Sequence, residues 1–253
     1  MNWWQFLLFP FAIIYDIITR CRNWFFDISI LKTHAFPQVF TISVGNLSVG
    51  GTGKTPMVEY LIRHGLNESW QIATLSRGYG RSTPGVILGD ENSGPKDLGD
   101  ESYGYLDQFG ASIKVVVSEN RAEGMRMILS SFPQVDVVIL DDAFQHRYVK
   151  PDFNILLTTF KKPFWEDFIL PSGRLREARV GYKRADHILV TKCPHDISPE
   201  FVGRVQQRLP SSYLGFTSIK YGSFVSVAGS VNEKFVAVAA IANNVDFFRY
   251  VQT

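Results

Sequence analysis

The chain has 253 residues, of which 45% are hydrophobic, 14% are aromatic and only 20% are charged. This length allows one large domain or about two smaller ones with a full core, which excludes small scaffolds held together by disulfides or metals. The apolar composition excludes intrinsic disorder. The formal net charge of +2 argues against nucleic acid as a partner, because nucleic-acid-binding proteins usually present a concentrated basic face.

The N-terminal region, residues 1–34, begins with an apolar stretch in which all but three residues from Trp3 to Ile18 are apolar. As a helix this stretch would span roughly 24 Å, less than the ~30 Å hydrocarbon core of a bilayer. Pro10 predicts a kink or a restart of the helix. Tryptophans at both ends and arginines just behind are typical of a helix lying in the membrane interface. We therefore predict an interfacial helix, with a buried core helix as the alternative.

Short apolar runs rich in β-branched residues recur between residues 35 and 212, and amphipathic helical patterns at Pro56–Leu66 and Asn120–Ser131 lie between them. Strands that alternate with helices predict an α/β fold with a mainly parallel sheet flanked by helices. The segment Pro84–Gly99 reads as an exposed loop or a short hairpin. The predicted strands are Val39–Val44, Ile72–Leu75, Lys114–Val117, Val135–Leu140, Phe153–Leu157 and His187–Val190.

The pattern changes after residue 212. Two alternating runs around Gly222 predict a β-hairpin linker over residues 213–232. The apolar run Phe235–Ala242 then reads as a buried strand that begins a second α/β domain at residues 233–253.

A glycine-rich run from Ser48 to Thr55 lies between a predicted strand and a predicted helix, as a P-loop requires. Its glycines let backbone N–H groups converge on phosphate oxygens at a helix N-terminus. Lys54 would contact the β/γ-phosphates, and the Thr55 hydroxyl would bind Mg²⁺. Ser48 stands where the usual motif has its first glycine. The predicted ATP- and phosphate-binding residues are Ser48, Val49, Gly50, Gly51, Thr52, Gly53, Lys54 and Thr55.

Two carboxylates, Asp141 and Asp142, follow another predicted buried strand. A carboxylate at the end of a parallel strand beside a P-loop is where a Walker-B acid holds Mg²⁺. The predicted Mg²⁺ ligands are therefore Thr55, Asp141 and Asp142. The run Thr191-Lys192-Cys193-Pro194 has a proline where guanine-specific P-loop proteins have an aspartate, so ATP is the expected nucleotide.

Four polar stretches cluster where a parallel sheet would expose its active edge. Together with the extended P-loop, they resemble the tetraacyldisaccharide 4′-kinase family, the lipid A kinases of Gram-negative bacteria. The resemblance covers nearly the whole chain, from the apolar N-terminus to the strand at Phe235. The stretches that carry it are Val44–Pro56, Leu75–Arg81, Leu98–Glu101, Asp141–Arg147 and Leu170–Glu177.

The resemblance implies transfer of the ATP γ-phosphate to the 4′-hydroxyl of a tetraacylated glucosamine disaccharide 1-phosphate, at the cytoplasmic face of the inner membrane. It makes Asp100 the acid beside the attacking hydroxyl, with Lys54 as its catalytic partner, and Glu101 is the alternative acid. Transfer to a sugar needs a carboxylate to orient the hydroxyl and accept its proton. We expect a monomer. Further candidates for substrate or phosphate contacts are Arg77, Arg81, Glu101, Arg121, Gln145, His146, Arg176 and Glu177.

Two other functions fit the motifs. One is a membrane-associated P-loop switch ATPase that acts on a protein partner, and the other is a nucleotide-binding assembly factor. The resemblance also implies a further C-terminal part with an Asp-His-His run, which has no counterpart before Thr253. We therefore expect nucleotide binding from these residues, but not full kinase activity.

Overall fold

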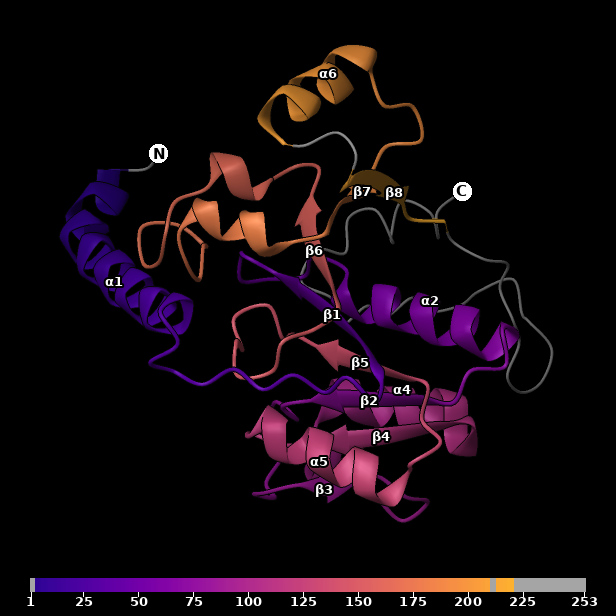
Figure 1. Cartoon of the computed structure of the whole chain (residues 1–253). Coiled ribbons are helices and arrows are strands. Elements are labelled where there is room, and N and C mark those ends of the chain that lie inside the picture. The colour runs from indigo at the N-terminus through magenta and orange to yellow at the C-terminus, as the bar shows by residue number, and fades with distance from the viewer. Residues whose placement is uncertain (1–2, 210–212, 221–253) are drawn as a thin grey trace, which may run out of the picture.

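Figure 1 shows a computed structural model of the chain, which describes residues 3–209 and 213–220. Within these residues a single eight-stranded sheet has the strand order β3-β4-β2-β5-β1-β6-β7-β8. Neighbouring strands are parallel except for the edge pair β3 and β4. The expected mainly parallel α/β sheet is confirmed. The strands are β1 Phe40–Asn46, β2 Ile72–Ser76, β3 Ile87–Leu88, β4 Ile113–Val117, β5 Val137–Asp141, β6 Phe153–Thr159, β7 His187–Cys193 and β8 Leu214–Ser218.

Helices cover both faces of the sheet because its central strands are apolar on both sides. On β5, Val137 and Ile139 pack in one core cluster with α2 and α4, whereas Val138 and Leu140 pack in another with α5. Figure 1 shows α2 and α5 on opposite sides of these strands. The helices are α1 Trp3–Asp27, α2 Lys54–Asn67, α3 Pro95–Leu98, α4 Asp100–Phe109, α5 Arg121–Ser131 and α6 Pro199–Arg208, with 3₁₀ turns at Gly110–Ser112, Phe164–Glu166 and Arg179–Arg184.

The carboxyl ends of the parallel strands bring the predicted motifs to one edge. β1 leads into the P-loop, β5 ends at Asp141, and β2 ends just before Arg77. β1 lies between β5 and β6, so the chain leaves the middle of the sheet in both directions from the P-loop strand. Ligands bind at such a reversal point in open α/β sheets.

The N-terminal helix differs from its predicted form. α1 runs without interruption from Trp3 to Asp27, so the expected restart at Pro10 is wrong. Proline removes one backbone hydrogen bond and crowds one carbonyl, and both effects are local, so a long helix can continue past them. Within the described residues, no helix combines the length and hydropathy needed to cross a bilayer.

Two other segments can be compared with their predicted structure, the loop at Pro84–Gly99 and the hairpin over residues 213–232. Pro84–Gly99 contains the short antiparallel strand β3 and the one-turn helix α3. The first arm of the predicted hairpin forms β8, which is parallel to β7 and extends the main sheet beyond residue 212. Leu214 and Phe216 bind it there by packing against the third core cluster. The rest of the hairpin and the predicted second domain, residues 233–253, lie outside the described residues.

Gly45 is a point of close approach between β1 and the segment after β5. A Cβ atom at Gly45 would lie 2.6 Å from Phe144 Cβ and 3.0 Å from the Phe144 backbone nitrogen. We expect Gly45→Ala to lower the free energy of unfolding by about 1–3 kcal/mol, because overpacking forces the backbone apart. Urea denaturation measures the change.

The control for this substitution is Gly104→Ala in α4, where an added Cβ meets nothing within 4 Å. This change should stabilise the protein by about 0.5–1 kcal/mol, since alanine favours a helix interior. Equal effects of the two substitutions would contradict the proposed close approach.

Candidate active site

The P-loop lies between β1 and α2 and is held from two sides. The Val49 backbone nitrogen donates to the Arg174 oxygen at 2.8 Å, and Ser48 forms an antiparallel bridge with Leu175. On the other side, the Thr191 hydroxyl donates to the Thr52 oxygen and Lys192 Nζ to the Gly51 oxygen, both at 2.7 Å. These bonds fix the loop so that its amides can receive phosphate oxygens at the N-terminus of α2.

Asp142 is the meeting point of the two predicted phosphate motifs. Lys54 Nζ lies 3.8 Å from Asp142 Oδ1. Arg176 Nη1 donates to both carboxylate oxygens of Asp142 at 2.9 Å and lies 3.5 Å from Gln145 Oε1. Asp142 itself adopts a left-handed conformation, with φ 47°. A lysine and an arginine thus converge on one carboxylate beside the P-loop. When a nucleotide binds, its phosphate oxygens could take the place of the carboxylate as partners of the two cations, and a divalent cation could take their place on the carboxylate.

Asp141 is almost fully buried and is bonded at only one carboxylate oxygen. Tyr105 donates to Oδ2 at 3.0 Å, whereas Oδ1 is buried without a partner among the described residues. Burial, together with the charge of Glu101, raises the pKa of Asp141 to about 6. Burial and the Asp141 charge also raise the pKa of Tyr105, on which the Thr55 hydroxyl acts in the opposite direction. Tyr105 is therefore bonded to one predicted Mg²⁺ ligand, Asp141, and its pKa also responds to a second one, Thr55.

These residues fit a magnesium ion that is bound together with a nucleotide. The described part of the chain has no group of three or more His, Cys, Asp or Glu side chains placed to hold a metal by themselves. Mg²⁺ usually takes only one or two carboxylates and completes its octahedron with phosphates and water. The unpartnered Asp141 Oδ1 offers an oxygen of the hard type that Mg²⁺ prefers.

Arg77, Arg81 and the two aspartates lie close enough to Arg121 for their charges to act on it. Arg121 is almost fully buried, and it donates to the Ser118 oxygen at 2.6 Å and to the Asp141 backbone oxygen at 3.1 Å. Burial, followed by the positive charges of Arg77 and Arg81, lowers the pKa of Arg121 to about 10 against the opposing charges of Asp141 and Asp142. Arg121 still carries its charge at neutral pH.

Several donors of this arginine cluster have no acceptor. The Arg121 Nε, Arg81 Nε and Arg81 Nη1 atoms are buried without a hydrogen-bond partner among the described residues. Arg81 is held by an ion pair with Glu119 and by the Gly85 oxygen. Buried guanidinium donors without acceptors favour an anionic ligand, and phosphate matches their geometry.

Asp100 and Glu101 form the first turn of α4, whose N-cap is Gly99. A Cβ atom at Gly99 would lie 2.4 Å from the Tyr79 oxygen, and Gly99 has a φ of 80°. The turn is thereby packed against the loop that carries Arg77 and Arg81. Glu101 lies four residues before Tyr105 on the same side of α4. Its negative charge helps to raise the pKa of Asp141. Asp100 is exposed and shares its side of the helix with the exposed Gly104 and Asp107.

Three of the predicted substrate contacts occupy supporting positions. Glu177 is buried; its Oε1 accepts from Arg184 at 2.7 Å and from Gln145 at 3.3 Å, and its Oε2 accepts from Asn23 at 2.7 Å. Gln145 also donates to the Asn46 oxygen at 2.7 Å. Burial and nearby arginines, Arg121 first, lower the pKa of His146 to about 4, so His146 is neutral at physiological pH.

Sequence reasoning did not single out Tyr105 or the Asn46 side chain as site residues. Tyr105 reads as one more apolar residue of an amphipathic helix, and only its position four residues after Glu101 could have marked it. Asn46 donates from Nδ2 to Thr52 Oγ1 at 2.6 Å and is fully buried at the end of β1. A polar residue that follows a buried strand directly before a P-loop is the signal for such a bond.

Comparisons with a family model, with curated proteins and with solved structures all point to the same kinase family. Residues 4–253 match the model of the tetraacyldisaccharide-1-P 4′-kinase family. The chain is 46% identical to a tetraacyldisaccharide 4′-kinase of Flavobacterium psychrophilum and 44% identical to one of Flavobacterium johnsoniae. Each alignment covers 100% of this chain and 76% of the relative. A crystal structure of LpxK from Aquifex aeolicus in complex with ATP is similar with a TM-score of 0.67 and 29% sequence identity, over 90% of this chain and 86% of that chain.

The raised pKa of Asp141 predicts a stability cost in the protein without nucleotide or metal. Between about pH 4 and pH 6 the unfolded chain loses a proton that the folded protein retains, so folding becomes less favourable as the pH rises through this range. We expect Asp141→Asn to raise the free energy of unfolding at pH 7.5 by roughly 2 kcal/mol in the presence of a chelator. Urea denaturation at pH 7.5 and at pH 4 measures this.

Most of the gain should be lost at pH 4, where the folded carboxyl is protonated and the unfolded one is close to its ordinary pKa of 3.8. Asp196→Asn, at an exposed position, should change stability little at either pH. An equal gain at both pH values would mean that packing rather than the buried charge explains the effect.

Proposed function

Because the chain belongs to the tetraacyldisaccharide-1-P 4′-kinase family, we propose that it transfers the γ-phosphate of ATP to the 4′-hydroxyl of a tetraacylated glucosamine disaccharide 1-phosphate, a step of lipid A biosynthesis. The observation that carries this proposal is the convergence of Lys54 and Arg176 on Asp142 beside the P-loop. A phosphate loop, two carboxylates and unpaired arginine donors on one sheet edge suit phosphoryl transfer between two anionic substrates.

The P-loop amides and Lys54 would hold the β- and γ-phosphates of ATP. Thr55, Asp141 and Asp142 are the residues that would bind Mg²⁺. An ion held by these residues would supply positive charge against the negative charge that develops on the phosphates during transfer. Lys54 and Arg176 already face Asp142, so a shift of either cation toward the phosphates would add positive charge to the transferred group.

In the reaction, the bond from the γ-phosphorus to the 4′-oxygen forms while its bond to ADP breaks, and the hydroxyl proton must pass to a base. We assign that base to Asp100, which is exposed to an incoming sugar at the start of α4. The charge of Glu101 raises the pKa values of Asp141 and Tyr105, so we assign Glu101 to the Mg²⁺ side of the site. Arg81 and Arg121 would bind the acceptor's phosphate or the transferred group through the donors that have no partner among the described residues, and the exposed Arg77 would add its guanidinium to the same anion.

The membrane surface is the proposed place of this reaction. α1 carries large apolar side chains that are 39–65% exposed, two of which, Phe9 and Ile13, also border the cavity beside the helix, whereas other side chains of α1 contact the protein. A helix with such exposed apolar side chains binds the interface between lipid headgroups and acyl chains. We propose a monomer at the cytoplasmic face of the bacterial inner membrane. The exposed apolar residues are Leu7, Phe9, Phe11, Ile13, Ile14, Ile17, Ile18, Trp24 and Phe25.

The proposed reaction predicts ADP formation that depends on the acylated disaccharide, together with a lipid product heavier by one phosphate. Asp100→Asn should lower kcat by about 100-fold or more with little change in nucleotide affinity, since general bases contribute factors of about 10²–10⁴. Mass spectrometry of the lipid and a coupled ADP assay measure both quantities.

Asp107→Asn, on the same exposed side of α4, is the control and should leave kcat unchanged. ATP hydrolysis that is equal with and without the disaccharide, and that yields no phosphorylated lipid, would favour the switch ATPase instead.

The proposed membrane helix predicts that paired Ile14→Asn and Ile18→Asn substitutions lower the affinity for vesicles of phosphatidylethanolamine and phosphatidylglycerol. The loss should be roughly tenfold or more, because each isoleucine withdraws apolar area from water on binding. Co-sedimentation measures it. Ile219→Asn, an exposed isoleucine outside α1, is the control, and an equal loss for both proteins would contradict a specific role of α1.

A further inference from the structure

The side of α1 that contacts the protein buries Ala12 and Phe26 and also carries polar groups bonded to two segments near Asp142. These are the segment 145–147, which follows β5, and the pair Arg176 and Glu177. Figure 1 shows α1 at the side of the molecule, away from the helices that cover the sheet. An anchor alone would need only its outward apolar face. The bonds on the other face therefore call for a separate explanation.

The first set of bonds joins the C-terminal half of α1 to the segment 145–147. Arg22 Nη2 donates to the Gln145 oxygen at 2.9 Å. Arg147 donates to the Asn23 oxygen at 2.8 Å and to Asp27 Oδ1 at 2.6 Å. Phe26 is buried here, with the guanidinium carbons of Arg22 and Arg147 at 5.5 and 5.2 Å from its ring centre. Cation–π contacts thus add to the hydrogen bonds.

The second set joins α1 to the residues beside Asp142. The Tyr15 hydroxyl donates to the Arg176 oxygen at 2.9 Å, and Asn23 Nδ2 donates to Glu177 Oε2 at 2.7 Å. The other oxygen of Glu177 accepts from Gln145 Nε2. Because the Glu177 carboxylate is buried, a lost donor leaves a charged oxygen unsatisfied, which is costly.

Asn23 is the residue where these two sets meet. Its amide bonds Glu177, and its backbone oxygen accepts from Arg147. A connected path leads from Asn23 through Glu177 to Gln145, and from Gln145 to Arg176, which pairs with Asp142. Each step is a hydrogen bond or an ion pair between partly or fully buried groups.

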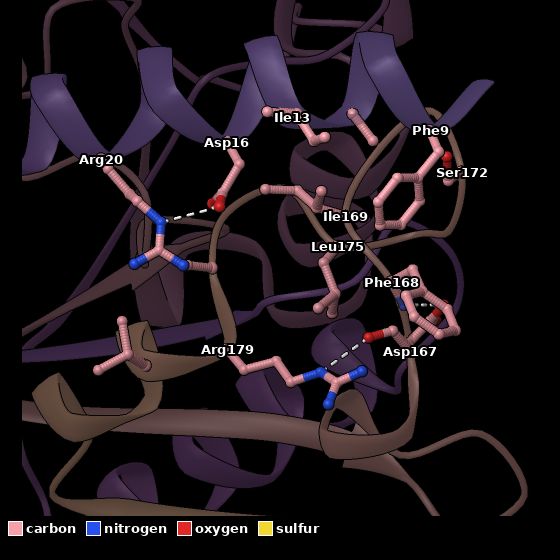
Figure 2. Close-up of a pocket in the computed structure, with 13 residues that line it drawn as sticks. Phe9, Ile13, Asp16, Arg20, Asp167, Phe168, Ile169, Ser172, Leu175 and Arg179 are labelled. Carbon is pink, nitrogen blue, oxygen red and sulfur yellow. Dashed lines mark hydrogen bonds and ion pairs between the residues drawn. The ribbon is translucent and has the colours of Figure 1, made fainter. Parts of the chain in front are cut away.

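The N-terminal half of α1 is supported less closely. A cavity of about 320 Å³ lies between this half and the segment after β6, and Figure 2 shows the residues that line it. Phe9 and Ile13 line it from the helix, and Phe168, Ile169 and Leu175 from the opposite side. The bonds of α1 are therefore concentrated toward its C-terminal half, beside the active site.

We propose that Asn23 is a positioning residue for phosphoryl transfer, acting through Glu177 and Gln145 on the Arg176–Asp142 pair. α1 is then part of the catalytic framework as well as a membrane contact. This inference rests on the proposed kinase function for its kinetic readout. The same positioning role also predicts weaker ATP binding in the presence of Mg²⁺ when Asn23 is replaced, and this can be measured without the lipid substrate.

The test compares the full chain with Asn23→Ala, using acylated disaccharide dispersed in detergent so that membrane binding does not limit turnover. We expect kcat to fall about tenfold with KM for the lipid unchanged, since a lost bond to a buried carboxylate is of that order. The affinity for ATP in the presence of Mg²⁺ should fall by about the same factor. Asn23→Gln, which retains an amide donor, should recover part of both losses.

Two controls separate positioning from anchoring and from folding. Thr19→Ala removes a hydroxyl that bonds only within α1, to the Asp16 oxygen at 3.0 Å, and should leave all readouts unchanged. Vesicle co-sedimentation should be the same for Asn23→Ala and for the unaltered chain. If Asn23→Ala does not fold, Tyr15→Phe removes a single hydroxyl from the same network and should lower kcat without affecting vesicle binding.

The outcomes distinguish the two proposals. If the unaltered chain phosphorylates the lipid and Asn23→Ala retains its kcat and ATP affinity, the positioning role is wrong. It is also wrong if kcat falls only together with vesicle binding. If the unaltered chain yields no phosphorylated lipid, the proposed kinase function fails. The ATP affinities of the two proteins then still decide whether Asn23 positions the phosphate site.

Discussion

The convergence of two cations on Asp142 is the interaction on which the rest of this site depends. Lys54 comes from the P-loop, Asp142 from the end of β5, and Arg176 from a segment that returns to the P-loop through Leu175. No two of these residues are near neighbours in the chain. The parallel sheet places the P-loop and Asp142 side by side, because β1 and β5 are adjacent and both end at the same edge.

The site also retains charged groups at some cost to stability. Among the residues that the structure describes, Asp141 has a buried oxygen without a partner, and the almost fully buried Arg121 has an unpaired nitrogen. Such groups persist in proteins where a ligand completes their bonding. Opposite charges limit the cost here, since Arg121 is bonded to the Asp141 backbone and both aspartates act to keep it charged. The preorganised polarity that phosphoryl transfer needs is thus in place before any substrate binds.

Much of the fold followed from residue patterns. The six strands expected from apolar runs all exist with boundaries shifted by at most a few residues, because strands buried on both faces leave a continuous apolar signal. The P-loop and the two aspartates lie together as predicted. Their roles in the reaction, like those of Asp100 and Glu101, stay predictions that the experiments above address.

The supporting network could not be read from the sequence. The sequence predicted Glu177 as a substrate or phosphate contact, and only folding shows that Asn23, Gln145 and Arg184 surround it. Hydrogen bonds between residues more than a hundred positions apart leave no periodic signal. The uninterrupted course of α1 through Pro10 was missed for a related reason, since a local rule for proline does not describe a helix fixed elsewhere by long-range bonds.

The thickness of α1 has a consequence for how a lipid would reach the site. A helix with its side chains is about 10 Å across, and here one side is apolar while the other contacts Arg176 and Glu177. With α1 in the interface, as proposed, the phosphate-binding edge stands about one helix diameter above the acyl chains, near the level of the headgroups. A sugar at the top of a lipid could then be phosphorylated while its acyl chains stay in the bilayer, so the enzyme would not need to extract its substrate.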